Sequence, residues 1–131
     1  MAGAPPTPLA RFADWLTRYG DAWEAADADA MGALFTIGAT VLPSPFADLR
    51  RGRRAIVRYF ADEFLRWSDT SFSAQVLGVG DTYAVAHWRI ASETAALDGV
   101  LVAALDDRGR CTSLRQWWHE TSVVQSSATL H

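Results

Sequence analysis

Apolar residues recur at two different periods in this sequence, and the change between the periods is the feature that most constrains the fold. From Leu9 to Trp67 they lie three and four positions apart, which is the spacing of amphipathic helices. After Asp69 they alternate with other residues, which is the spacing of half-buried strands. Helices followed by a run of strands predict an α+β domain, in which the helices pack on one face of an antiparallel sheet.

The first helix is predicted to start near Pro8. Thr7 is a residue type that caps helices, and proline is tolerated in a first turn. The apolar positions that keep helical spacing are mostly aromatic: Phe12, Trp15, Leu16, Tyr19 and Trp23. We therefore expect this helix to present one aromatic face.

Two further helices and a short strand are expected next. The second helix covers residues 27–35, with Gly38 as its terminator. Residues 39–42 follow as a strand, and residues 43–52 form a loop because two prolines and a glycine exclude regular structure. The third helix covers residues 53–67, where apolar and charged positions again keep helical spacing.

Three turn signals divide the rest of the chain into four long strands. The turns are expected at residues 78–81, 93–96 and 106–109. The strands are expected at residues 71–79, 82–92, 97–105 and 111–123. Because strands joined by short turns pair as neighbours, the four predict an antiparallel meander.

The composition fits one domain over residues 1–131, with an ordered core over about 8–123 and flexible ends. Six Trp exceed what so small a core needs, so some are expected to line a cavity or an interface. The net charge of -3 argues against a nucleic-acid partner. Cys111 is the lone cysteine, so neither a disulfide nor a metal site is expected. The sequence contains no signal peptide or bilayer-spanning stretch, which predicts a cytoplasmic protein without a membrane partner.

Several segments, in their order and spacing, resemble the SnoaL-like members of the nuclear transport factor 2-like superfamily. RYGDAWEAADADAMGALFTIGATV has the pattern of that family's first two helices and following strand, and GRRAIVRYF that of its third helix. DGVLVAALDDRGRCTSLRQWWHE matches its closing hairpin. The resemblance implies a cone-shaped fold, in which three N-terminal helices and a curved antiparallel sheet enclose an apolar pocket. It also implies a homodimer through the outer face of the sheet, no cofactor, and no single activity.

Two activities of the superfamily need residues that this sequence lacks. Alignment with ketosteroid isomerase places Tyr19 at its tyrosine position, but Pro43 at the base and Leu101 near the second donor. Proline takes up no proton, so that mechanism is excluded. An epoxide hydrolase of this fold needs an Arg-x-Asp step on a strand, whereas Arg89 is followed by Ile and Ala.

Alternation along the strands, combined with the resemblance, predicts which side chains face the pocket. Glu120 is the one inward carboxylate on the last strand. Burial there would raise its pKa and suit a general acid or base, whereas at an open rim it would be solvated and inert. Tyr19 and Glu120 are the expected catalytic pair. The expected ligand-binding residues are Trp15, Trp23, Tyr59, Trp88, Gln116 and Trp118.

The opposite face of the same strands carries polar and aromatic residues that suit a dimer interface. His87, Arg115 and His119 face outward in this register, and a bulge would move them into the pocket instead. Asp98 opens a strand, where capping a turn or pairing with Arg89 or Arg115 competes with a catalytic role.

Four arginines, at positions 50, 51, 53 and 54, surround Gly52 at the start of the third helix. A helix N-terminus favours anions, so this group would suit a phosphate or carboxylate. The spacing of a phosphate-binding loop is absent, and a solvated loop is the default interpretation.

Three functions from different classes remain open. The first is a cyclase or isomerase that acts on a small apolar substrate by acid/base chemistry through Tyr19 and Glu120. The second is a binding module whose Trp-rich cavity holds a small hydrophobic molecule without chemistry. The third is a dimerisation domain whose pocket is filled by its own aromatic side chains.

Overall fold

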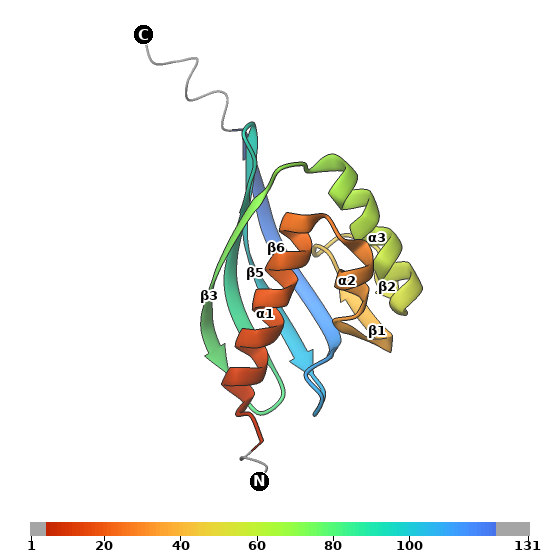
Figure 1. Ribbon diagram of the computed structural model, residues 1–131, viewed down its shortest axis with the longest axis vertical. Coiled ribbons are helices and arrows are strands. Elements are labelled where there is room, and N and C mark those ends of the chain that lie inside the picture. Colours follow the sequence, from red (N-terminus) through yellow and green to blue (C-terminus); the bar gives the residue numbers. More distant parts are fainter. Residues whose placement is uncertain (1–4, 123–131) are drawn as a thin grey trace.

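The computed structural model describes residues 5–122, in which three helices lie against one face of a six-stranded sheet (Figure 1). In chain order the elements are α1 (Pro8–Ala25), α2 (Ala28–Gly32), β1 (Phe35–Leu42), β2 (Arg50–Arg51), α3 (Arg53–Arg66), β3 (Ser71–Val79), β4 (Ala84–Ala91), β5 (Ala95–Leu105) and β6 (Cys111–Ser122). The predicted α+β class is confirmed. Val123 and the two chain ends, which were expected to be flexible, lie outside the described residues.

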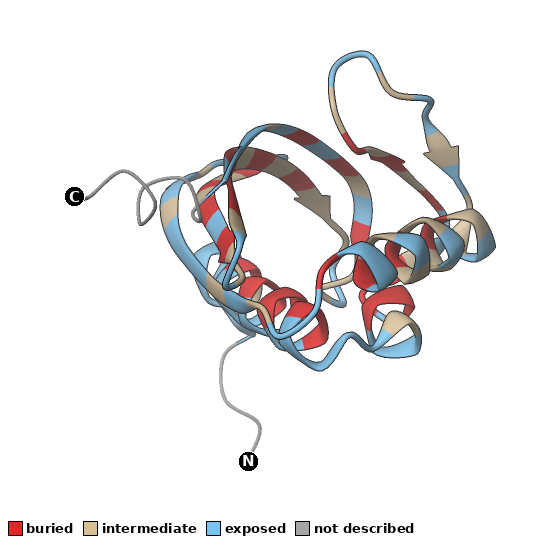
Figure 2. Ribbon diagram, turned by 90° about the horizontal axis from the view of Figure 1, so that it is seen from above, coloured by how far each residue is buried: buried red, intermediate tan, exposed pale blue. Residues whose placement is uncertain are grey.

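The sheet has the strand order β2-β1-β6-β5-β4-β3. Strands β3 to β6 form the predicted antiparallel meander, and β1 pairs with β6 in parallel, so the sheet is mixed rather than antiparallel throughout. The parallel pair is possible because α3 and the meander supply a long crossover between β1 and β6. Seen from above, the sheet curves around the helical side without closing (Figure 2).

The first helix has the predicted cap. Thr7 Oγ1 accepts a hydrogen bond of 3.1 Å from the Ala10 N–H, and the helix ends at Ala26, which adopts the left-handed conformation with φ 51°. The aromatic face is buried against the sheet and α3. Trp15 stacks on Tyr19 with ring centroids 5.1 Å apart. The helix therefore fills the concave side of the sheet with rings.

Helix α2 is shorter than expected, and this corrects the second-helix prediction. It ends at Gly32, so that β1 already begins at Phe35 and includes Gly38. The physical reason is tertiary: the Leu34 carbonyl accepts hydrogen bonds from Cys111 N (2.7 Å) and Trp15 Nε1 (3.1 Å), which hold the chain in an extended path beside β6. The predicted loop also contains the two-residue strand β2, which pairs with β1.

The four long strands lie close to their predicted positions. Strand β3 has the expected bounds, β4 is shorter at both ends, and β5 starts two residues earlier than predicted. Among the described residues, no helix is both long enough and apolar enough to cross a membrane.

Candidate functional site

Burial along the strands confirms the predicted inward face. Trp88 on β4 and Gln116 on β6 are buried, whereas Arg89 and Arg115 beside them are exposed. No register shift interrupts β4 or the part of β6 from Leu114 onward, so the bulged alternative is not realised.

The alternative site residues consequently lie on the outer face of the sheet, as expected for strands without a bulge. His87 Nε2 lies 2.8 Å from Asp98 Oδ1, and Arg89 Nε lies 3.7 Å from Asp98 Oδ2. Arg115 and His119 are exposed on the same side. The pairing of Asp98 with Arg89 is the structural role that the sequence left open.

Tyr19 and Gln116 form the central polar contact of the interior. The Gln116 Nε2 group donates a hydrogen bond of 2.6 Å to the Tyr19 hydroxyl oxygen, and both side chains are buried. Burial raises the pKa of Tyr19 to about 12, although the nearby Trp23 indole and the Gln116 amide lower it in part. The Tyr19 hydroxyl donates to no acceptor among residues 5–122. The phenol therefore stays protonated at neutral pH and keeps a donor to offer.

The indole N–H groups divide into two sets. Trp15 Nε1 donates to the Leu34 carbonyl at 3.1 Å, and Trp118 Nε1 donates to the Pro43 carbonyl at 2.7 Å. The Nε1 groups of Trp67 and Trp88 are buried and form no hydrogen bond to the described residues, whereas the Trp23 indole acts on the Tyr19 hydroxyl. Buried donors normally have a partner, so Trp67 and Trp88 are exceptions to the pairing of the interior.

Glu63 is a candidate acid or base that the sequence prediction missed. Only 13% of its side chain is exposed, and burial raises its pKa while the ion pair with Arg66, at 3.3 Å, lowers it in part. Its charge raises the pKa of both Tyr19 and Tyr59, which places the three groups within electrostatic reach of one another. The spacing of Tyr59 and Glu63, four residues apart on one face of α3, was the signal in the sequence.

Glu120 lies at the rim of the cone. Its side chain is 44% exposed, and its Oε1 atom lies 3.8 Å from Arg66 Nη2. It lines a surface hollow of about 280 Å³, together with Arg66 and Trp67. The structure thus matches the rim alternative for Glu120, and Arg66 links it to the more deeply buried Glu63.

Packed rings occupy much of the interior where an apolar pocket was expected. Trp23 packs edge-on against Phe64 with ring centroids 4.9 Å apart, and Tyr19 packs against Phe60 at 6.0 Å. The buried residues line the concave side of the sheet and the facing helices (Figure 2). Tyr59 is half-buried at the edge of this cluster, with Arg50 stacked 5.4 Å from its ring centroid.

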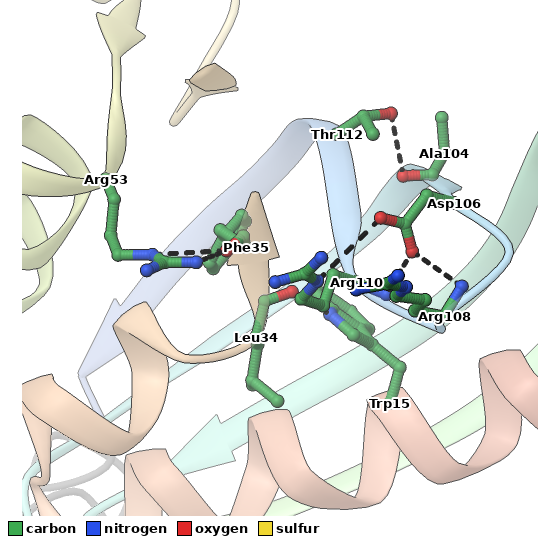
Figure 3. Close-up of polar contacts among 9 residues, drawn as sticks. All are labelled: Trp15, Leu34, Phe35, Arg53, Ala104, Asp106, Arg108, Arg110 and Thr112. Carbon is green, nitrogen blue, oxygen red and sulfur yellow. Dashed lines mark hydrogen bonds and ion pairs between the residues drawn. The ribbon is translucent and has the colours of Figure 1, made fainter. Parts of the chain in front are cut away.

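The arginine group before α3 is partly structural. Arg53 donates to the Phe35 carbonyl through Nη2 (2.6 Å) and Nε (3.2 Å), as Figure 3 shows, which fixes α3 to the start of β1. This contact commits one of the four guanidinium groups to the fold rather than to an anion. Within residues 5–122 no group of three or more His, Cys, Asp or Glu side chains is placed to hold a metal ion.

Comparison with solved structures supports the fold. An epoxide hydrolase/cyclase-like enzyme, SalBIII, described in pyran ring formation in the polyether salinomycin, superposes with a TM-score of 0.71 at 20% identity, over 82% of this chain and 89% of that chain. A putative isomerase from Bacillus subtilis superposes with a TM-score of 0.74 at 19% identity, over 87% of this chain and 90% of that one. These identities establish the fold alone.

Comparison with sequences establishes the family. A search of curated proteins found no relative of significant similarity. The family model described as "SnoaL-like domain" matches residues 16–117, which is more than half of the chain. The chain therefore belongs to the SnoaL-like domain family, as the sequence motifs predicted.

Proposed function

We propose that this protein is a proton-transfer enzyme of the cyclase or isomerase kind, acting on a small and mainly apolar molecule that carries a carbonyl oxygen. The observation that carries the proposal is the buried Tyr19–Gln116 pair, whose hydroxyl proton has no acceptor among the described residues. The two structural neighbours are a cyclase-like enzyme and a putative isomerase, which agrees with this class of reaction.

Tyr19 supplies the electrophilic group in this proposal. Removing a proton beside a carbonyl places negative charge on the carbonyl oxygen, and a fixed donor in an apolar interior stabilises that charge strongly. Gln116 holds the phenol in place from β6 through the 2.6 Å hydrogen bond.

Glu63 is the proposed base. A buried carboxyl with a raised pKa is a better proton acceptor than a solvated one, because its pKa lies nearer neutral pH. Glu63 removes the proton from carbon and returns it at another position, while Tyr19 binds the oxygen. Arg66 lies close to both Glu63 and Glu120. Arg66 lowers the pKa of Glu63, whereas the negative charge of Glu120 raises it.

The remaining expected ligand-binding residues divide by position. Tyr59 on α3, Trp88 on β4 and Trp118 on β6 all belong to or pack against the buried cluster, where they shape the space for substrate in this proposal. Trp15 is fixed by its bond to Leu34 and supports Tyr19 from behind. Substrate binding requires some of these rings to move, since they pack against one another in the structure.

Deuterium exchange gives a test that does not need the natural substrate. A set of small apolar ketones is incubated with the protein in D₂O, and loss of the proton beside the carbonyl is followed by NMR. We expect exchange by the wild type and a loss of about 100-fold or more in Glu63→Gln and in Tyr19→Phe. Asp81→Asn, an exposed turn variant, is the matched control. Absence of exchange with every ketone, or equal rates in Glu63→Gln and Asp81→Asn, would contradict the proposal.

A binding module without chemistry is the second candidate function, and the unpaired buried indole groups favour it. Their N–H donors serve a bound small molecule equally well when no bond is made or broken. Ketones that quench tryptophan fluorescence at micromolar concentration without any exchange in D₂O would support binding over catalysis.

We also propose that the protein forms a homodimer through the outer face of the sheet. Trp117 is 43% exposed there, opposite Val100 in the register of β5 and β6. An exposed aromatic residue surrounded by half-buried aliphatic and charged side chains has the composition of an interface.

A further inference from the structure

A second hollow lies on the outside of the cone, away from the Tyr19 site. It has a volume of about 320 Å³ and lies between the start of α1, residues 33–34 and the β5–β6 turn. Four arginines line it, at positions 11, 18, 108 and 110, together with only two carboxylates, Asp14 and Asp107. Asp106 also forms an ion pair with Arg110, so four arginines face three carboxylates and the hollow carries a net charge of +1 in a chain whose net charge is -3.

Two of the four guanidinium groups are already engaged. Arg18 Nε lies 3.1 Å from Asp14 Oδ2, and Arg11 Nη1 donates to the Pro6 carbonyl at 2.8 Å. A third, Arg110, forms an ion pair with Asp106 but keeps donors to spare, and Arg108 keeps all of its own. Arg108 forms no ion pair or side-chain hydrogen bond with residues 5–122. Arg110 Nε is buried without a hydrogen bond, and Asp106 Oδ2 lies 3.8 Å away from it.

The turn that carries Arg108 and Arg110 is held in one conformation. Asp106 Oδ1 accepts hydrogen bonds of 2.9 Å from the backbone N–H of both residues, and Gly109 provides the positive φ of 78° that the turn needs. Figure 3 shows the contacts of Asp106 with Arg108 and Arg110. The backbone from which the two arginine side chains extend is thus fixed before any ligand arrives.

The shape and charge of the hollow define the ligand class. A guanidinium group matches the oxygens of a phosphate with paired hydrogen bonds, and the excess of arginines over carboxylates favours an anion. Pro6, Ala10 and Leu34 supply apolar surface beside the arginines. The volume is at the small end of the range for small-molecule sites.

We propose that this hollow binds a compact organic phosphate monoester, with the phosphate on Arg108 and Arg110 and the apolar group on the exposed side chains of Pro6 and Ala10. The site is separate from the interior around Tyr19 and Gln116, and it stands whether or not the proposed proton transfer occurs.

Phenyl phosphate is the probe for the test, and isothermal titration calorimetry with amide chemical-shift mapping is the measurement. We expect millimolar or tighter binding at low salt, with shifts centred on residues 106–110, and weaker binding as salt rises. Arg108→Gln should weaken binding about tenfold, because it removes a charged hydrogen bond. Asp107→Asn should strengthen binding by removing an opposing charge.

Arg58→Gln is the matched control, since Arg58 is exposed on α3 away from the hollow. Equal effects of Arg58→Gln and Arg108→Gln would overturn the site, and so would phenyl phosphate shifts that map elsewhere. Binding of inorganic phosphate as tight as that of phenyl phosphate would overturn the role given to the apolar wall. The folded state of each variant is verified by circular dichroism, and Arg108 is exposed, so its replacement leaves the core intact.

Discussion

Gln116 on β6 donates a buried hydrogen bond of 2.6 Å to the hydroxyl of Tyr19 on α1, across 97 positions of the chain. The bond joins the first helix to the last strand in an interior that is otherwise almost wholly apolar. Both side chains are buried, so water cannot take the place of either partner. Removal of one partner therefore leaves the other as an unsatisfied buried group. The pair is therefore both a structural tie and the centre of the proposed site.

The first prediction concerns the stability carried by this bond. Tyr19→Phe and Gln116→Leu should each lower the free energy of unfolding by about 1–3 kcal/mol, whereas the double variant should lose less than the sum of the two. Tyr83→Phe, at a side chain that is 51% exposed, should change stability by less than about 0.5 kcal/mol. Urea denaturation of the four variants measures the coupling. Strict additivity would show that the bond contributes nothing.

The second prediction concerns pH and Glu63. Because burial raises its pKa, Glu63 holds a proton in the folded state at pH values where the unfolded chain has released it. Stability from this group is thus fully present below the ordinary carboxyl pKa and is lost as pH rises through the raised value. Glu63→Gln should reduce this loss, so that the free energy of unfolding changes less with pH over that range. Urea denaturation at a series of pH values measures the change. The exposed Glu93→Gln should keep the wild-type curve.

Much of the fold could be predicted because the two apolar periods are strong signals over long segments. The aromatic face of α1 and the inward positions Trp88 and Gln116 follow directly from the spacing of residues. The end of α2 did not follow, since the bonds that fix Leu34 come from Trp15 and Cys111, far away in the chain. The parallel pairing of β1 with β6 depends on the same distant contacts.

The sequence predicted some residues of the candidate site and missed others. Tyr19 was found through the family resemblance and Gln116 through strand alternation. Alternation also brought Glu120 to the inner face, but it carries no information on depth, and Glu120 lies at the rim. Glu63 was missed because helical spacing marks charged residues as solvated, whereas the folded chain leaves only 13% of this side chain exposed and pairs it with Arg66.

The third prediction tests how tightly β5 and β6 pack beneath the site. A Cβ atom at Gly99 would lie 2.7 Å from Trp118 Cβ and would also clash with the Trp117 carbonyl. Gly99→Ala should therefore destabilise the fold by about 1–3 kcal/mol and displace Trp118 from the Pro43 carbonyl. Thermal unfolding and the Trp118 indole NMR signal report the two effects. An unchanged melting temperature would contradict the prediction, because it would show that β5 and β6 can move apart at Gly99 without loss of stability.

Gly38→Ala is the matched control for that substitution. Gly38 also lies in a strand, but nothing lies within 4 Å of the position of its Cβ atom. The change should leave stability within about 0.5–1 kcal/mol of the wild type, and on the favourable side, because alanine restricts the unfolded chain more than glycine does.

The final prediction concerns the outer face of the sheet. If Trp117 lies at the centre of a homodimer interface, Trp117→Glu should raise the dissociation constant by about thirtyfold or more, because a buried aromatic anchor is replaced by a charge. Light scattering after size-exclusion chromatography over a dilution series measures the shift. Phe46→Glu, a fully exposed loop residue, should leave the dimer unchanged. A wild type that elutes as a monomer at all concentrations would refute the interface, and the half-buried Val100 beside Trp117 would then face solvent in the native state.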